Sequence, residues 1–131
     1  MPEKSEHERI IKQSKEKVKL SERYINTHNE VIKTYKERKK FEKGFLETIK
    51  KQKSYWEDQL KKTDPQKDKG RYNELKDKIE NEKSLIKQIK DELDNLDKNI
   101  INEEKDKEKE IIRGEDEEEH TEEEEERQDE S

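Results

Sequence analysis

The side chains that most often carry out chemistry are few and scattered in this chain. The three histidines, His7, His28 and His120, are isolated, and none belongs to an i,i+3 or i,i+4 carboxylate pattern in an apolar setting. There is no cysteine, no Gly-x-Ser-x-Gly motif and no glycine-rich phosphate loop. The many carboxylates would be solvated, so nothing raises a pKa as general acid or base catalysis requires. We therefore expect no enzyme, no metal and no cofactor.

Three aspartates, Asp91, Asp94 and Asp97, superficially suggest a calcium loop. Their spacing is i,i+3, whereas an EF-hand loop places its ligands at i,i+2 and needs a glycine at the turn. The spacing instead predicts the polar face of a helix.

A basic stretch covers residues 33–62, with 11 Lys/Arg against 5 Asp/Glu. It could follow a phosphate backbone or hold an acidic partner, although lysine gives no readout of bases. Its lysines could equally pair with an acidic second helix. The candidate site for an anionic partner comprises Lys36, Arg38, Lys39, Lys40 and Lys43.

The segment after Gly114 has no apolar residue, and ten of its first twelve positions are Asp or Glu. Because like charges at i,i+4 repel, we expect a disordered tail over residues 114–131. The tail could solubilise the protein, screen the basic stretch, or bind a basic protein. The candidate site for a basic partner comprises Glu117, Glu118, Glu119, Glu122, Glu123, Glu124, Glu125 and Glu126.

An aromatic cluster, Tyr55 and Trp56 with Tyr72, lies beside the expected turn. The tryptophan could anchor an interface. The interpretation that we favour is that it seals the end of a helical core.

The composition limits the kinds of fold that can position these side chains. Charged residues are 53% of the 131 residues and hydrophobic ones 22%, too few apolar side chains for a globular core with a buried cleft. The chain has no run of ~20 apolar residues, which is the length that a membrane-spanning helix requires. The N-terminus lacks the apolar region of a secretion signal, so we expect an intracellular protein, cytoplasmic or, in a eukaryote, nuclear.

The first predicted helix covers residues 5–62, after a short tail at 1–4. Ser5 and Glu8 have capping-box spacing, and no proline follows before Pro65. Gly44 lies inside the pattern without shifting its phase, so we expect a weak point or a slight kink and no helix end. Two apolar rows with helical spacing run along this segment: Leu20, Tyr24, Val31, Tyr35, Phe45, Ile49, Trp56 and Leu60, and beside them Ile11, Val18, Ile25, Ile32 and Leu46.

The second predicted helix covers residues 72–113, after a polar turn at 63–71 that contains Pro65 and Gly70. Its a and d positions alternate gaps of three and four without a slip, and Gly114 is a plausible C-cap. Asp64 and Pro65 could instead cap this helix, with Gly70 inside it. The seam positions are Tyr72, Leu75, Ile79, Glu82, Ile86, Ile89, Leu93, Leu96 and Ile100.

Together these elements predict an all-α fold, an antiparallel two-helix coiled-coil hairpin with a disordered acidic tail. A turn centred near residue 66 places Phe45 and Leu46 against Ile86 and Ile89. It also brings Ile111 and Ile112 to Val18 and Leu20 and leaves about 15 N-terminal residues unpaired. The expected interface comprises Leu20, Tyr24, Ile25, Val31, Ile32, Tyr35, Phe45, Leu46, Ile49, Trp56, Leu60, Tyr72, Leu75, Ile79, Ile86, Ile89, Leu93, Leu96 and Ile100.

Adjacent apolar pairs such as Phe45/Leu46 make the stripe wider than one seam, which favours bundles of more than two helices. We expect hairpins to dimerise or to dock on a partner helix. The expected function is a non-enzymatic coiled-coil scaffold or adaptor acting through protein–protein contacts. The alternatives are capture of a basic protein by the acidic tail, and nucleic-acid binding through the first helix with the tail as a screen. No membrane and no small-molecule substrate is expected.

Overall fold

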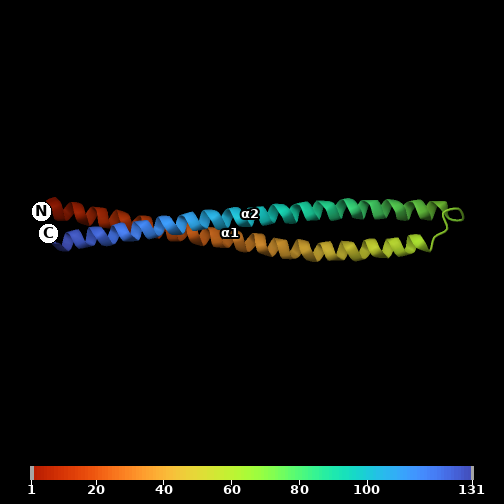
Figure 1. Cartoon of the computed structure of the whole chain (residues 1–131), viewed down its shortest axis with the longest axis horizontal. Helices are drawn as coiled ribbons and strands as arrows, with labels where there is room; N and C mark the ends of the chain where they lie inside the picture. Colours follow the sequence, from red (N-terminus) through yellow and green to blue (C-terminus); the bar gives the residue numbers. More distant parts are fainter. Residues whose placement is uncertain (1, 131) are drawn as a thin grey trace. The chain divides into compact units, whose positions relative to one another are not determined.

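The computed structural model describes residues 2–130, which form two long helices, α1 (Pro2–Lys61) and α2 (Lys69–Glu130) (Figure 1). The helices pack against each other, and the described residues contain no strand, so the predicted helical hairpin is confirmed. The packing divides into two units. The turn unit contains residues 35–99, and the terminal unit contains residues 1–34 with 100–131.

The connection between the helices is built by two aspartates. The Oδ1 atom of Asp64 accepts hydrogen bonds from the backbone N–H groups of Gln66 (2.8 Å) and Lys67 (3.3 Å). Asp68 Oδ1 accepts one from Arg71 N–H (3.1 Å), the geometry of an N-cap. Because Asp68 caps α2, this helix begins three residues before the predicted position 72, and Gly70 lies inside it.

The turn unit has an apolar seam. Leu46 and Ile49 of α1 are buried with Ile89 of α2, and Ile86 packs against this cluster. The predicted pairing of Leu46 with Ile86 and Ile89 is therefore confirmed. Leu75 is the one fully buried side chain among the described residues, with 0% of its surface exposed.

The terminal unit differs from the prediction. α2 continues to Glu130 and passes through Gly114 with no residue at positive φ, so Gly114 is not a C-cap and the acidic segment through Glu130 is helical. Its covered positions continue the 3–4 spacing of the seam and meet polar side chains of α1, among them His7, Ser21 and His28. Without a side chain, Gly114 admits Ser21, whose Cβ lies 3.4 Å from where a Cβ of residue 114 would stand. The covered positions are Glu103, Lys107, Glu110, Gly114, Glu117, Thr121, Glu124 and Gln128.

The N-terminal half of α1 also corrects the prediction. The helix begins at Pro2 and not at Ser5, which suits proline because the first turn has no use for its missing N–H. The expected unpaired overhang is absent, since Glu124 contacts His7. Met1 and Ser131, the outermost residues of the two expected tails, lie outside the described residues.

Candidate interaction surfaces

The expected interface residues fall into three groups, eight of them buried: Ile32, Leu46, Ile49, Leu75, Ile79, Ile89, Leu96 and Ile100. Eight more are half-buried: Ile25, Val31, Tyr35, Trp56, Leu60, Tyr72, Ile86 and Leu93. Leu20, Tyr24 and Phe45 are exposed, with 44%, 46% and 40% of their surface in solvent. The expected contact of Leu20 with Ile112 is also absent. Both side chains are exposed, and Ser21 and Glu110 occupy the seam at this level.

Heptad letters describe the two sides of the seam. Leu46 and Ile49 take a and d in α1, and Ile86 and Ile89 take a and d in α2, because these positions are the covered ones. In an antiparallel pair the g positions of the two helices face each other on one side of the seam and the e positions on the other. Farther from the seam, the c positions lie beside the g positions and the b positions beside the e positions. Each unit therefore has a g/c face and an e/b face.

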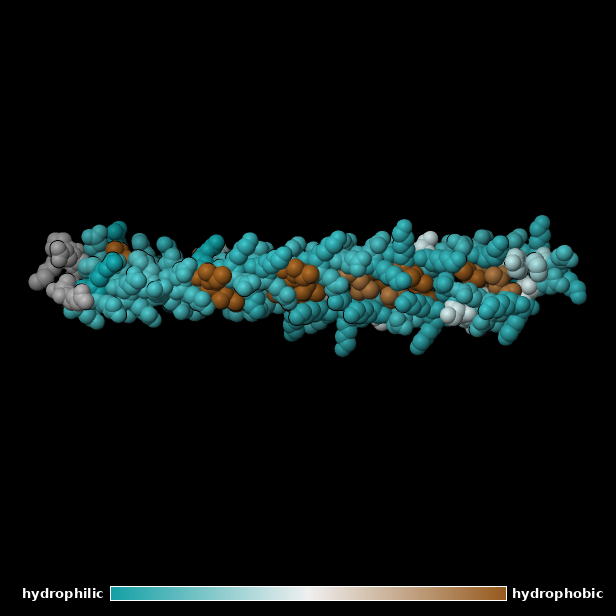
Figure 2. All heavy atoms as spheres, in the orientation of Figure 1, coloured by the Kyte–Doolittle hydropathy of each residue, from teal (hydrophilic) through white to brown (hydrophobic). Residues whose placement is uncertain are grey.

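Every apolar residue that α1 carries outside the seam lies on its g/c side. The seven residues are Ile10, Leu20, Tyr24, Val31, Phe41, Phe45 and Tyr55, whereas the b, e and f positions of α1 from residue 5 onward have none. Phe41 is 72% exposed. Apolar side chains reach the surface between charged ones in Figure 2. The placement is one-sided, as expected of a helix with a second neighbour.

The two phenylalanines of this row, Phe41 and Phe45, frame two hollows in the turn unit, which we call the Phe41–Phe45 patch. One hollow of about 370 Å³ lies between the helices and is lined by Phe41, Glu42, Phe45, Leu85, Gln88, Ile89 and Glu92. The other, of about 590 Å³, is lined by Glu37, Lys40, Phe41, Gly44, Phe45 and Thr48. A side chain at Gly44 would meet no atom within 4 Å, so the surface is open here.

The opposite, e/b face of the turn unit is rich in lysine. It gathers Lys36, Lys40, Lys43 and Lys50 from α1 with Lys83, Lys87 and Lys90 from α2, all exposed. Two of them have nearby acids on their own helix: Lys50 lies 3.8 Å from Glu47, and Lys83 lies 3.2 Å from Glu80. At the edge of this face, a hydrogen bond from Lys53 lowers the pKa of Glu57, and the charges of Lys83 and Lys61 lower it further.

The candidate anionic-partner site is thereby divided. Lys36, Lys40 and Lys43 belong to the lysine-rich face, whereas Arg38 lies at a g position on the other face. Lys39 occupies the seam and forms an ion pair with Asp97. The basic stretch of α1 does not predict the contribution of Lys83, Lys87 and Lys90, because a count along one helix cannot add the lysines of its antiparallel neighbour.

The candidate basic-partner site is also divided. Glu124 is buried and bonded to His7 (3.0 Å) and Arg127 (2.7 Å), Glu125 pairs with Lys15 (3.1 Å), and Glu117 lies 4.0 Å from Lys17. The other five are exposed and, within the part of the chain that the structure describes, have no ion-pair partner: Glu118, Glu119, Glu122, Glu123 and Glu126.

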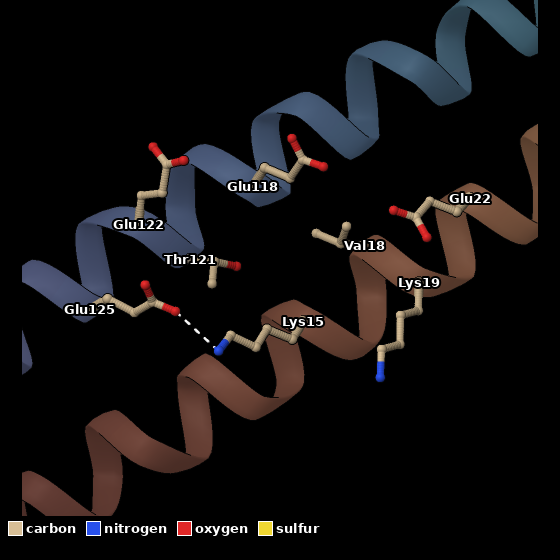
Figure 3. Close-up of a pocket in the computed structure, with 8 residues that line it drawn as sticks. All are labelled: Lys15, Val18, Lys19, Glu22, Glu118, Thr121, Glu122 and Glu125. Atoms are coloured by element: carbon tan, nitrogen blue, oxygen red, sulfur yellow. Dashed lines mark ion pairs between the residues drawn. The ribbon is translucent and has the colours of Figure 1, made fainter.

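A hollow of about 380 Å³ lies between the helices of the terminal unit (Figure 3). Val18 and Thr121 lie between the two ribbons, and Lys15 reaches across to Glu125 beside them. The hollow exists because small side chains occupy this part of the seam. Its remaining lining is Lys19, Glu22, Glu118 and Glu122. Among the described residues there is no group of three or more side chains suited to a metal ion.

Polar pairs cross the seam of the terminal unit where apolar layers would be expected. The hydroxyl of Ser21 donates to Glu110 Oε1 (2.9 Å), and Nδ1 of His28 lies 2.7 Å from Glu103 Oε2. The third pair joins His7 to Glu124. Two of the three histidines are thus bound to carboxylates of the other helix, which gives them a role in joining the helices.

Acid should weaken the His7–Glu124 pair. The hydrogen bond from His7, and then the charge of Arg127, lower the pKa of Glu124. Because the pKa is lower in the folded state, the pair stabilises the terminal unit above about pH 4.3, the ordinary glutamate value, and this stability is lost as pH falls through the folded pKa. We expect Glu124→Gln to lower the melting temperature at pH 7 and to differ little from wild type at pH 3, in thermal melts followed by circular dichroism.

The matched control is Glu122→Gln, which removes an exposed carboxylate without an ion-pair partner in the described residues. It should relieve repulsion and show no destabilisation at pH 7. Equal destabilisation by both variants would contradict the role given to the His7 contact.

The aromatic cluster lies beside the turn. The rings of Tyr55 and Trp56 meet edge to face with centroids 5.0 Å apart, and the ammonium of Lys78 stands 4.4 Å from the centre of the Trp56 ring. Trp56 is half-buried at a d position, while Tyr55 points outward at c. The cluster therefore contributes to both the seam and the g/c face.

Comparisons of the chain with protein-family models, with curated proteins and with solved structures each gave no match. Neither helix, over the described residues, has a stretch long and apolar enough to cross a membrane.

Proposed function

We propose that the protein is a non-enzymatic assembly protein whose helical hairpins associate through the g/c face of the turn unit. The observation that carries the proposal is a run of uncharged g and c positions on a chain that is 53% charged. On α1 the g and c positions from Phe41 to Tyr55 have no charge, and on α2 neither do those from Asn81 to Gln88. The eight residues are Phe41, Phe45, Thr48, Gln52, Tyr55, Asn81, Leu85 and Gln88.

The occupant that fits this face is the same face of a second copy. A two-fold dimer brings one patch against itself, so the patch must be self-complementary and free of like charges. Threonine and amide side chains around Phe41 and Phe45 satisfy this condition, because they can donate and accept hydrogen bonds in either orientation. The exposed aromatic rings supply the apolar area that such an interface buries at its centre.

We expect the double variant F41S/F45S to weaken self-association by about 100-fold. Burying one phenylalanine side chain stabilises an interface by about 1.5–3 kcal/mol, and its removal forfeits this free energy. A change of 1.4 kcal/mol alters a dissociation constant tenfold. Sedimentation velocity over a concentration series measures the effect, and circular dichroism checks that the helices remain.

The matched control is K51S/D58S, which introduces two serines at exposed f positions and leaves net charge unchanged. It should self-associate as wild type does. A wild-type protein that sediments as a monomer at every concentration would overturn the proposal.

A further inference from the structure

We propose that the lysine-rich e/b face of the turn unit binds the acidic helical segment 115–126 of a second copy of this chain. This contact lies on the side of the seam opposite the Phe41–Phe45 patch and shares with it only Lys40, which also lines one of the two hollows. It would add a second, charge-driven interface to the assembly.

The lysines of this face are arranged as two parallel rows. Lys36, Lys40 and Lys43 follow one another at gaps of four and three along α1. Lys83, Lys87 and Lys90 repeat the same gaps along α2. Since residues three and four apart share one side of a helix, each row presents its ammonium groups in one direction.

The middle of this face carries like charges from both helices. Lys43 and Lys50 flank the buried Leu46 and Ile49 at the e positions of α1, and Lys83 and Lys90 flank Ile86 and Ile89 at the e positions of α2. Acids meet these rows toward the two ends, where Lys83 helps to lower the pKa of Glu57 and Asp97 pairs with Lys39. Like charges gathered on one side of a seam destabilise an isolated hairpin, so an external anion would stabilise the centre of this face.

Four of these lysines stand three or four residues from an acid of their own helix, as Lys43 does from Glu47 and Lys87 from Asp91. In the part of the chain that the structure describes, no ion pair nevertheless involves Lys40, Lys43, Lys87 or Lys90. At the edge of the cluster, the charge of Lys83 contributes to lowering the pKa of Glu57. The face carries an excess of positive charge, since its e and b positions in the turn unit hold more lysines than acids.

The chain itself carries the complementary surface. Glu115, Glu119, Glu122 and Glu126 stand on α2 at gaps of four, three and four, which is the spacing of the lysine rows. All four are exposed, and within residues 2–130 none forms an ion pair. The terminal unit has 13 Lys/Arg against 23 Asp/Glu, net −10, and the turn unit has 19 against 15, net +4.

A nucleic acid fits this face less well. The seven residues that define it are all lysines, point charges without the planar fork with which arginine grips phosphate. No aromatic or amide group among them could stack on or read a base. A second copy, in contrast, offers a local acidic row of matching period.

A lysine-to-acid contact joins two different surfaces, so each copy keeps one of each kind free after pairing. Such heterologous contacts continue from copy to copy unless the rotation closes a ring. We therefore expect association by this interface to grow beyond dimers at low salt.

The experiment separates this interface from the Phe41–Phe45 patch by using F41S/F45S as the background of every variant. K43E/K87E/K90E reverses the lysine face, and E115K/E119K/E122K reverses the acidic row. At roughly 20 mM salt, where screening is weak, the F41S/F45S parent should associate, and raising salt to roughly 0.5 M should dissociate it. Each reversed variant alone should be monomeric at low salt.

An equimolar mixture of the two reversed variants should associate again, because each offers the surface that the other lacks. K51E/K98E/K105E is the control with the same change in net charge, made at exposed f positions, and it should associate as the parent does. Circular dichroism confirms helicity in each case, and K43Q/K87Q/K90Q replaces any reversed variant that loses it.

A parent that stays monomeric at low salt, or a mixture that fails to associate, would overturn the inference. So would binding of a DNA or RNA duplex that the K43E/K87E/K90E change abolishes while association is untouched. Loss of assembly in F41S/F45S at high salt concerns the apolar patch alone, so failure of the two proposals can be told apart.

Discussion

Replacing Leu75 with alanine lowers the free energy of unfolding of the turn unit by about 2–5 kcal/mol. Leu75 has none of its surface exposed and belongs to the narrow seam on which this unit depends. Truncation removes its transfer free energy and leaves a cavity, since two helices joined by one seam have few other side chains that could fill it. For a unit of this size each kcal/mol shifts the melting temperature by about 4–8 °C, so the shift should be at least about 10 °C.

Thermal and urea unfolding followed by circular dichroism measure this change. Leu20→Ala is the matched control, because Leu20 is 44% exposed at a c position and its truncation leaves no cavity. It should change stability by less than about 1 kcal/mol. If Leu75→Ala proves as mild as Leu20→Ala, the seam assigned to the turn unit is wrong.

The turn unit was predictable because most positions of its seam are apolar residues. From Leu75 to Ile100 the hydropathy of α2 alone gives the phase, and Leu46 then follows from the position of the turn. Phe45 shows the limit of that reasoning. Next to Leu46 in a wide stripe, it was assigned to the interface, whereas the heptad phase places it at g with its ring half in solvent.

The terminal unit was mispredicted because the α2 side of its seam carries no apolar residue beyond Ile100. Four residues of this seam are buried without being apolar. They are Ser14 and Ser21, seven residues apart on α1, and Gly114 and Thr121, seven residues apart on α2. Gly114 and Thr121, fourteen and twenty-one residues after Ile100, were the available signal. A local count of glutamates instead predicted disorder, because it ignored the lysines and His7 that α1 brings to the same segment.

The two candidate surfaces could not be predicted without the register between the helices. The one-sided row of Phe41, Phe45 and Tyr55 is present in the sequence, but it becomes a distinct face only when the a and d positions of α1 are known. The lysine-rich face needs both helices, since neither row alone exceeds what a solvated coiled coil normally carries. Pairing across the seam is thus what turns dispersed charges into two opposed surfaces.

Filling the polar seam stabilises the terminal unit by about 3 kcal/mol in the double variant S14L/T121L. Ser14 and Thr121 are 3% and 7% exposed, and burying each leucine is worth about 1.5–3 kcal/mol, from which the cost of some repacking is subtracted. The hollow of about 380 Å³ beside Thr121 and Val18 gives a larger side chain room. No bond between the helices is lost, because the Thr121 hydroxyl donates only to the carbonyl of Glu117 in its own helix.

Hydrogen exchange of the amides around residues 14 and 121 measures this gain separately from the turn unit. In the wild-type protein we expect faster exchange there than around Leu75, because polar pairs replace apolar layers in that seam. The substitution should slow it about 100-fold, the equivalent of about 3 kcal/mol. Ser84→Leu, at an exposed position of α2, is the control and should leave exchange in the terminal unit unchanged. If S14L/T121L exchanges as wild type does, the terminal helices are not held together at these positions, and the polar seam is not what limits the stability of that unit.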